Sequence, residues 1–110
     1  MIFSNGRCWF GNFNGMDYYP EYNEPFNIYT KYENNLPKDV IIRHIESLDA
    51  AIAAFWTYDI FTGEQLPYAG VYHDGKFRFP TDFLYYYKKY DIGIPPEYEK
   101  YLIEEVGLAA

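Results

Sequence analysis

The chain has 110 residues, of which 49% are apolar and 23% are charged, a composition typical of globular domains rather than disordered chains. This length favours a single domain, residues 1–110, with one hydrophobic core. The formal charge of −7, from 16 acidic and 9 basic residues, argues against direct binding of nucleic acid because such a protein repels phosphate backbones.

The first 36 residues are rich in turn formers, with short aromatic runs between them. Ile2-Phe3 and residues 8–10 predict a small hairpin, because Asn5-Gly6 between them readily adopts the positive φ of a tight turn. Residues 17–22 are expected to form an aromatic loop, and residues 26–29 a lone strand.

Residues 38–55 have the strongest helical pattern. Apolar side chains recur every three or four residues and form one stripe: Ile41, Ile45, Leu48, Ile52 and Phe55. Pro37 suits the first turn, where its missing N–H costs nothing. An alternative interpretation makes residues 40–45 a strand and begins a shorter helix at Ser47, but the unbroken stripe favours one helix.

Three segments after this helix predict an antiparallel meander: residues 56–61, 68–73 and 76–79. The last two are joined by Asp74-Gly75, and Asp-Gly between aromatic runs is a strong hairpin signal. Pro67 and Gly70 would disturb the middle strand, which indicates a bulge or an edge position there.

Two short helices are predicted at the C-terminal end, over residues 82–90 and 97–106. Thr81 suits the N-cap of the first helix, and Gly107 is expected to end the second. Together the elements predict an α+β fold, with a small antiparallel sheet packed against the helix at 38–55 and two further helices near the C-terminus.

Cysteine use and hydropathy indicate the compartment. A single cysteine, Cys8, excludes an internal disulfide and fits a reducing environment. The N-terminal residues lack a signal-peptide pattern, and no run approaches the ~18 apolar residues of a membrane span. We therefore expect a cytoplasmic protein, in its own cell or in a host cell, that does not bind membranes.

Few residues could support catalysis or hold a metal. Cys8, His44 and His73 do not form a spaced ligand pair, so we expect neither a specific metal site nor another cofactor. A small enzyme using these three side chains with a carboxylate stays a hypothesis. Simpler roles are favoured: Cys8 as a buried apolar residue, His44 as a hydrogen-bonded residue beside the apolar stripe, and His73 at a strand end.

The most unusual feature is the aromatic share of 23%, which includes 14 tyrosines. One small core does not hide so many tyrosines, and exposed tyrosines are common at protein interfaces. The candidate protein-binding residues lie on the predicted C-terminal helices and in the aromatic loop: Tyr18, Tyr19, Tyr22, Tyr85, Tyr86, Tyr90 and Tyr101.

These features favour a protein-interaction module, an inhibitor or adaptor whose acidic residues steer a partner with a basic surface; a homodimer also fits. Viral and mobile-element proteins that block host machinery are an analogy for this type. A second hypothesis is a small-ligand or carbohydrate-binding domain with an aromatic groove, in which Trp9 and Trp56 stack on sugar faces. Acidic mimicry of nucleic acid ranks lowest, because the charges are spread evenly along the chain.

Overall fold

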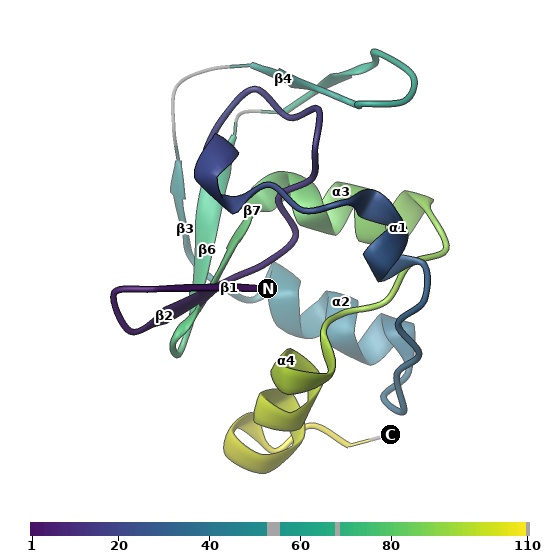
Figure 1. The fold of residues 1–110 in the computed structure, drawn as a ribbon. Helices are drawn as coiled ribbons and strands as arrows, with labels where there is room; N and C mark the ends of the chain where they lie inside the picture. Colours follow the sequence, from purple (N-terminus) through teal and green to yellow (C-terminus); the bar gives the residue numbers. More distant parts are fainter. Residues whose placement is uncertain (53–55, 68, 110) are drawn as a thin grey trace.

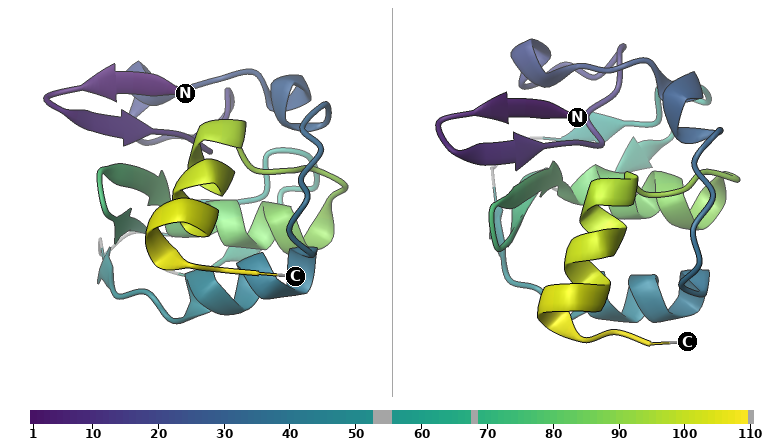
Figure 2. Two further views of the ribbon diagram at one scale, coloured as in Figure 1. Left: turned by 90° about the horizontal axis from the view of Figure 1, so that it is seen from below. Right: turned by 60° about the horizontal axis from the view of Figure 1, so that its bottom comes forward.

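The computed structural model describes residues 1–52, 56–67 and 69–109 (Figure 1). Within these residues a five-stranded sheet has the order β1-β2-β7-β6-β3. Its strands are β1 (Ile2–Ser4), β2 (Arg7–Trp9), β7 (Phe77–Pro80), β6 (Gly70–Asp74) and β3 (Ala50–Ile52). Helices α2, α3 and α4 lie together on one face of this sheet (Figures 1 and 2), so the predicted α+β class is confirmed.

The N-terminal hairpin is confirmed, because β1 and β2 pair antiparallel on either side of Asn5-Gly6. The sheet as a whole is mixed, because one of its pairings is parallel. Strand β2 runs parallel to β7, with Trp9 beside Arg78. Residues 10–76 separate these two strands in the sequence, so no tight turn dictates their relative direction.

The hairpin of β6 and β7 is confirmed, but the predicted meander is only partly right. Asp74 pairs with Phe77, so the turn is one residue later than expected and Asp74 still belongs to β6. Residues 56–61 do not join this sheet; they contain β4 (Thr57–Tyr58), which pairs with β5 (Gln65–Leu66) in a separate small sheet. The position beside β6 that was predicted for residues 56–61 is instead occupied by β3.

Strand β6 is therefore an interior strand, and the prediction of an edge position is wrong. Gly70 begins the strand where β3 approaches most closely. A Cβ atom there would lie 2.6 Å from the carbonyl oxygen of Ala51. The glycine permits this approach of two backbones, which is one of the roles that glycine has in strands.

The helix expected over residues 38–55 is shorter, and α2 covers Lys38–Glu46. Residues 40–45 are helical, so the alternative of a strand there is also wrong. Ser47 ends the helix, and its hydroxyl donates a hydrogen bond of 2.5 Å to the carbonyl of His44. The chain then enters β3, where strand β6 supplies backbone partners. Phe55 of the predicted stripe lies outside the described residues.

Residues 26–29 form one helical turn, α1 (Phe26–Tyr29), rather than the lone strand predicted. Tyr29 is fully buried, and Phe26, three residues earlier on the same side of the turn, is half-buried against the core. Burial of both rings favours a helical turn, since a strand would separate Phe26 and Tyr29 onto opposite faces. The preceding aromatic loop contains the 3-10 helix η1 (Pro20–Tyr22).

Both C-terminal helices are confirmed. Helix α3 (Thr81–Lys89) begins one residue earlier than predicted, so Pro80 and not Thr81 is its N-cap. Helix α4 (Pro96–Tyr101) continues into a π-helical turn, η2 (Leu102–Val106), and Gly107 ends it with a left-handed φ of 85°. Every helix in the described part of the chain is too short or too polar to cross a membrane.

Aromatic rings fill most of the core. The largest fully buried side chains include four tyrosines and five phenylalanines: Tyr29, Tyr86, Tyr87, Tyr98, Phe10, Phe13, Phe77, Phe79 and Phe83. Buried phenol groups need hydrogen-bond partners. Several find a buried carboxylate, as Tyr29 does with Glu24 at 2.7 Å and Tyr98 with Asp74 at 2.6 Å. Of the tyrosines that the structure describes, Tyr18, Tyr29, Tyr86, Tyr87 and Tyr98 are buried, and the others are at least partly exposed, as expected.

Candidate functional site

The carboxylate of Asp59 organises the surface between the β4–β5 hairpin and helix α3. One oxygen, Oδ1, accepts hydrogen bonds from the backbone N–H groups of Phe61 at 2.7 Å and Thr62 at 3.1 Å, which closes the hairpin loop. The other, Oδ2, accepts bonds of 2.7 Å from the hydroxyls of Tyr85 and Tyr90. We call these five residues the Asp59 network; it fixes the loop to the C-terminal half of α3.

The electrostatics of this network favour the ionised aspartate. Burial opposes ionisation, but the hydrogen bonds from two tyrosines and two backbone amides outweigh it and hold the pKa of Asp59 well below its usual range. Burial and the bond to Asp59 raise the pKa of Tyr90 to about 12. Lys89 adds a cation, with its Nζ 2.9 Å from the Tyr85 hydroxyl and 3.6 Å from Asp59.

Three aromatic rings meet beside this network and form the three-ring cluster, which consists of Phe26, Phe61 and Tyr90. The ring centroids are 4.8 Å apart for Phe26 and Phe61, 5.2 Å for Phe61 and Tyr90, and 5.8 Å for Phe26 and Tyr90. All three pairs have edge-to-face geometry, which is favourable for aromatic contacts. Phe61 is 54% exposed although it makes these contacts.

A buried tyrosine packs against the three-ring cluster. Tyr86 is fully buried, and its ring stacks on Tyr90 with centroids 5.9 Å apart. Its hydroxyl accepts a hydrogen bond of 2.9 Å from the backbone of Ile60, next to Phe61 in the loop. The exposed ring of Phe61 is therefore attached to a loop that is anchored at two points, by the Asp59 carboxylate and by the bond between Ile60 and Tyr86.

The seven tyrosines proposed from the sequence do not form one surface. Tyr86 and Tyr18 are buried, and the Tyr18 hydroxyl donates to Asp82 at 2.8 Å, so neither ring is available as the exposed anchor that we expected. Tyr85 and Tyr90 are half-buried and belong to the Asp59 network.

The other three predicted tyrosines lie elsewhere. Tyr101 is half-buried and donates to Asp74 at 3.1 Å. Tyr19 and Tyr22 reach the surface beside Trp9, and the Trp9 and Tyr22 rings are stacked with centroids 4.2 Å apart. One face of Trp9 is thus covered by a tyrosine.

Sequence reasoning missed Phe26 and Phe61, the two phenylalanines of the three-ring cluster. Both lay in segments that were interpreted as strands, and the structure gives them a helical turn and a loop. The available signal for Phe61 was its position directly before the turn cluster Thr62-Gly63, since an aromatic residue at a loop tip is commonly exposed. No pattern near Phe26 indicates that it meets Phe61.

The three candidate catalytic residues have different surroundings. Cys8 is fully buried on the helical side of the sheet, and burial raises the pKa of its thiol, which opposes reactivity. His44 is hydrogen-bonded as expected, with its Nε2 2.8 Å from Asp74 Oδ2. His73 is exposed, on the face of the sheet opposite to Asp74. Among the described residues, no cluster of His, Cys, Asp and Glu suits a metal ion.

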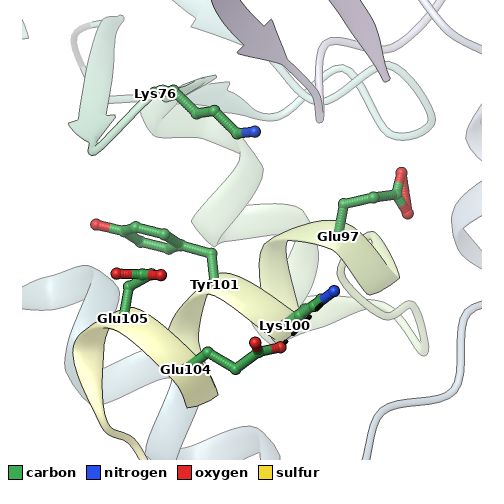
Figure 3. A pocket seen from close by; sticks show the side chains of 6 residues that line it. All are labelled: Lys76, Glu97, Lys100, Tyr101, Glu104 and Glu105. Atoms are coloured by element: carbon green, nitrogen blue, oxygen red, sulfur yellow. Dashed lines mark ion pairs between the residues drawn. The ribbon is translucent and has the colours of Figure 1, made fainter.

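An open pocket of about 580 Å³ lies between the β6–β7 turn and the last helix (Figure 3). Lys76 extends into it from the turn, opposite side chains of α4 and η2, which are Glu97, Lys100, Tyr101, Glu104 and Glu105. Lys100 and Glu104 form an exposed ion pair of 3.9 Å. The lining has mixed charge, with two lysines, three glutamates and one tyrosine.

Comparisons of the chain with protein families, with curated proteins and with solved structures found no match.

Proposed function

We propose that this chain is a protein-interaction module, an inhibitor or adaptor that binds a partner protein through the three-ring cluster of Phe26, Phe61 and Tyr90. The observation that supports this proposal is the exposed ring of Phe61, held in contact with two other rings at the surface. Aromatic residues in such clusters supply much of the binding energy of protein interfaces.

The rigidity of the cluster favours binding over a purely structural role. Ordering a mobile side chain at an interface costs about 0.5–1.5 kcal/mol. Phe61 avoids most of that cost, because the loop that presents it is anchored by Asp59 and Tyr86 before any partner arrives. More than half of the Phe61 side chain stays in contact with water, so its ring is accessible to a partner.

Charge supplies the second part of the proposal. The net charge of −7 would speed association with a protein that has a basic surface and would oppose direct contact with nucleic acid. A cytoplasmic location, in the producing cell or in a host cell, is included because the single cysteine is unpaired and buried. A homodimer through the same cluster is one form that the interaction could take.

The test is a pull-down with the tagged chain from lysate of the source cell, read by mass spectrometry, with Phe61→Ala in parallel. Phe3→Ala is the matched control, since Phe3 is 69% exposed on β1 and lies outside the cluster. With the purified partner, Phe61→Ala should weaken binding at least about 30-fold, as expected for a central anchor, and Phe3→Ala should have little effect. Equal binding by wild type and Phe61→Ala would reject the cluster as the docking site. Analytical ultracentrifugation of the purified chain alone would show whether it forms a homodimer.

A further inference from the structure

Helices α2, α3 and α4 lie on one face of the five-stranded sheet (Figures 1 and 2). The opposite face presents a row of side chains that the proposed function does not use. Trp9 on β2 pairs with Arg78 on β7, and Arg78 pairs with His73 on β6. Paired residues of neighbouring strands project from the same side of a sheet, and so does Arg7, two residues before Trp9. We call Arg7, Trp9, His73 and Arg78 the outer basic patch.

This patch has the opposite charge to the molecule as a whole. The chain contains only 9 lysines and arginines. Four of them have carboxylate partners in the structure: Arg43, Lys88, Lys89 and Lys100. Within the described residues, no carboxylate forms an ion pair with Arg7 or Arg78. Two arginines therefore share one surface of an acidic protein without a neutralising group.

The cations of the patch are close enough to repel one another. Partial burial and the charge of Arg7 lower the pKa of Arg78, and burial together with both arginines lowers the pKa of His73. Arg78 is held in place, because its Nη1 donates to the carbonyl oxygens of Gly75 at 2.7 Å and Phe77 at 2.8 Å. An anion placed between these side chains would relieve the repulsion without rearrangement of the guanidinium of Arg78.

Preformed aromatic contacts border the patch. The Trp9 ring stacks on Tyr22 with an angle of 4° between the planes. The centroid of the Tyr19 ring lies 5.7 Å from that of Trp9. Asn12 holds the loop behind these rings, since its Nδ2 donates to the carbonyls of Tyr18 and Tyr19 at 3.0 and 3.2 Å. Tryptophan, tyrosine and arginine are the residue types most enriched among the energetic hot spots of interfaces.

We propose that the outer basic patch binds an acidic segment of a partner protein, whose carboxylates contact Arg7 and Arg78 while an adjoining apolar side chain packs on Trp9. This surface is separate from the three-ring cluster, so the inference goes beyond the proposed function. A short acidic segment fits better than nucleic acid, because the net charge of −7 repels a long polyanion beyond the reach of the patch. The arginine guanidinium is also well matched to carboxylates in geometry.

The proposal can be tested with the purified full-length chain by NMR titration at about 50 mM and about 300 mM salt. The three probes are a capped hexaglutamate peptide, a capped hexalysine peptide and a hexameric oligothymidylate. We expect hexaglutamate to shift the resonances of the patch, to raise the measured pKa of His73 because carboxylates stabilise its imidazolium, and to lose affinity at the higher salt. Tighter binding of oligothymidylate would overturn the proposal in favour of nucleic acid, and absence of hexaglutamate binding at low salt would also overturn it.

Matched variants separate specific binding from general charge. Arg7→Gln and Lys31→Gln each remove one exposed positive charge, and neither side chain has an ion pair in the described structure. Arg7→Gln should weaken hexaglutamate binding about threefold at low salt, a typical effect for one exposed charge, and Lys31→Gln should leave it unchanged. Equal effects of both variants would overturn the proposal.

The proposed function is tested independently of this inference. Phe61→Ala should leave hexaglutamate binding intact, because Phe61 is not part of the patch. A normal hexaglutamate response with no effect of Phe61→Ala on the protein partner would reject the cluster alone. Loss of partner binding in Phe61→Ala, together with no binding of hexaglutamate to the wild type, would reject the patch alone.

Discussion

Replacement of Asp59 by alanine should strongly destabilise the protein, although this residue lies in a loop. The side chain of Asp59 is fully buried and accepts four hydrogen bonds. Alanine would leave the Tyr90 hydroxyl without its acceptor and the Tyr85 hydroxyl with only its longer bond of 3.2 Å to Glu64. It would also release the loop that positions Phe61.

The size of the effect follows from these contacts. Hydrogen bonds to a charged group contribute about 1.5–3 kcal/mol each when they are buried. The two backbone amides lie near the surface, where water replaces much of the lost bonding, and the two tyrosines are half-exposed. We therefore expect a loss of about 3 kcal/mol in the free energy of unfolding, well below the sum of four full contributions, and a fall in Tm of roughly 10 °C.

Urea denaturation at neutral pH measures this loss, with Asp39→Ala as the matched control. Asp39 is 76% exposed and forms only a surface ion pair of 3.5 Å with Arg43, so its replacement should cost at most about 0.5 kcal/mol. An Asp59→Ala protein that is destabilised by less than about 1 kcal/mol would refute the reasoning.

The pH dependence provides a second test. The folded state lowers the pKa of Asp59 below the value of about 3.9 in the unfolded chain. The contribution of the Asp59 carboxylate to the free energy of unfolding is therefore complete above pH ~4. It declines at lower pH, because the unfolded state then binds more protons than the folded state. The stability difference between wild type and Asp59→Ala should narrow as the pH falls from about 4 to about 2. A constant difference would contradict the assigned role of the carboxylate.

Three further predictions concern the packing. Gly75→Ala should cost about 2 kcal/mol or more in urea denaturation, since φ is +58° and the new Cβ would lie 2.8 Å from the Tyr101 hydroxyl. Gly63→Ala is the control, because Gly63 has φ of +75° with open space around it, and it should cost only about 1 kcal/mol. If both variants lost the same free energy of unfolding, the contact with Tyr101 would be excluded as the cause of the loss in Gly75→Ala. Tyr98→Phe removes a 2.6 Å bond to a buried aspartate and should lower the free energy of unfolding by about 1–2 kcal/mol; an unchanged urea midpoint would argue against that bond. Cys8 should react with a thiol reagent only after unfolding, because it is buried with a raised pKa; rapid labelling of the native protein would contradict this.

Local sequence determined the elements whose signals are short-range. Asn5-Gly6 specifies the first hairpin, because both residues adopt the positive φ that its tight turn requires. Gly107 ends the last helical segment for the same conformational reason. The C-terminal helices were predictable because their apolar spacing agrees with the helix-favouring residues near their ends, although Pro80 rather than Thr81 is the N-cap of α3. The α+β class follows from these elements without knowledge of long-range contacts.

Only the tertiary structure decided where α2 ends and which aromatic rings are exposed. Ile41, Ile45, Leu48 and Ile52 satisfy helical spacing, but strand β6 offers backbone partners to residues 50–52, and pairing overrides the helical pattern. The three-ring cluster comes from a helical turn, a loop and a helix end that are distant in the sequence. Exposure of a ring depends on what other segments cover it, and periodicity describes only the ring's own segment. For that reason the sequence indicated an excess of tyrosine, whereas the fold decided that Phe61 is exposed and that six tyrosines donate to buried carboxylates. These six are Tyr18, Tyr29, Tyr85, Tyr90, Tyr98 and Tyr101.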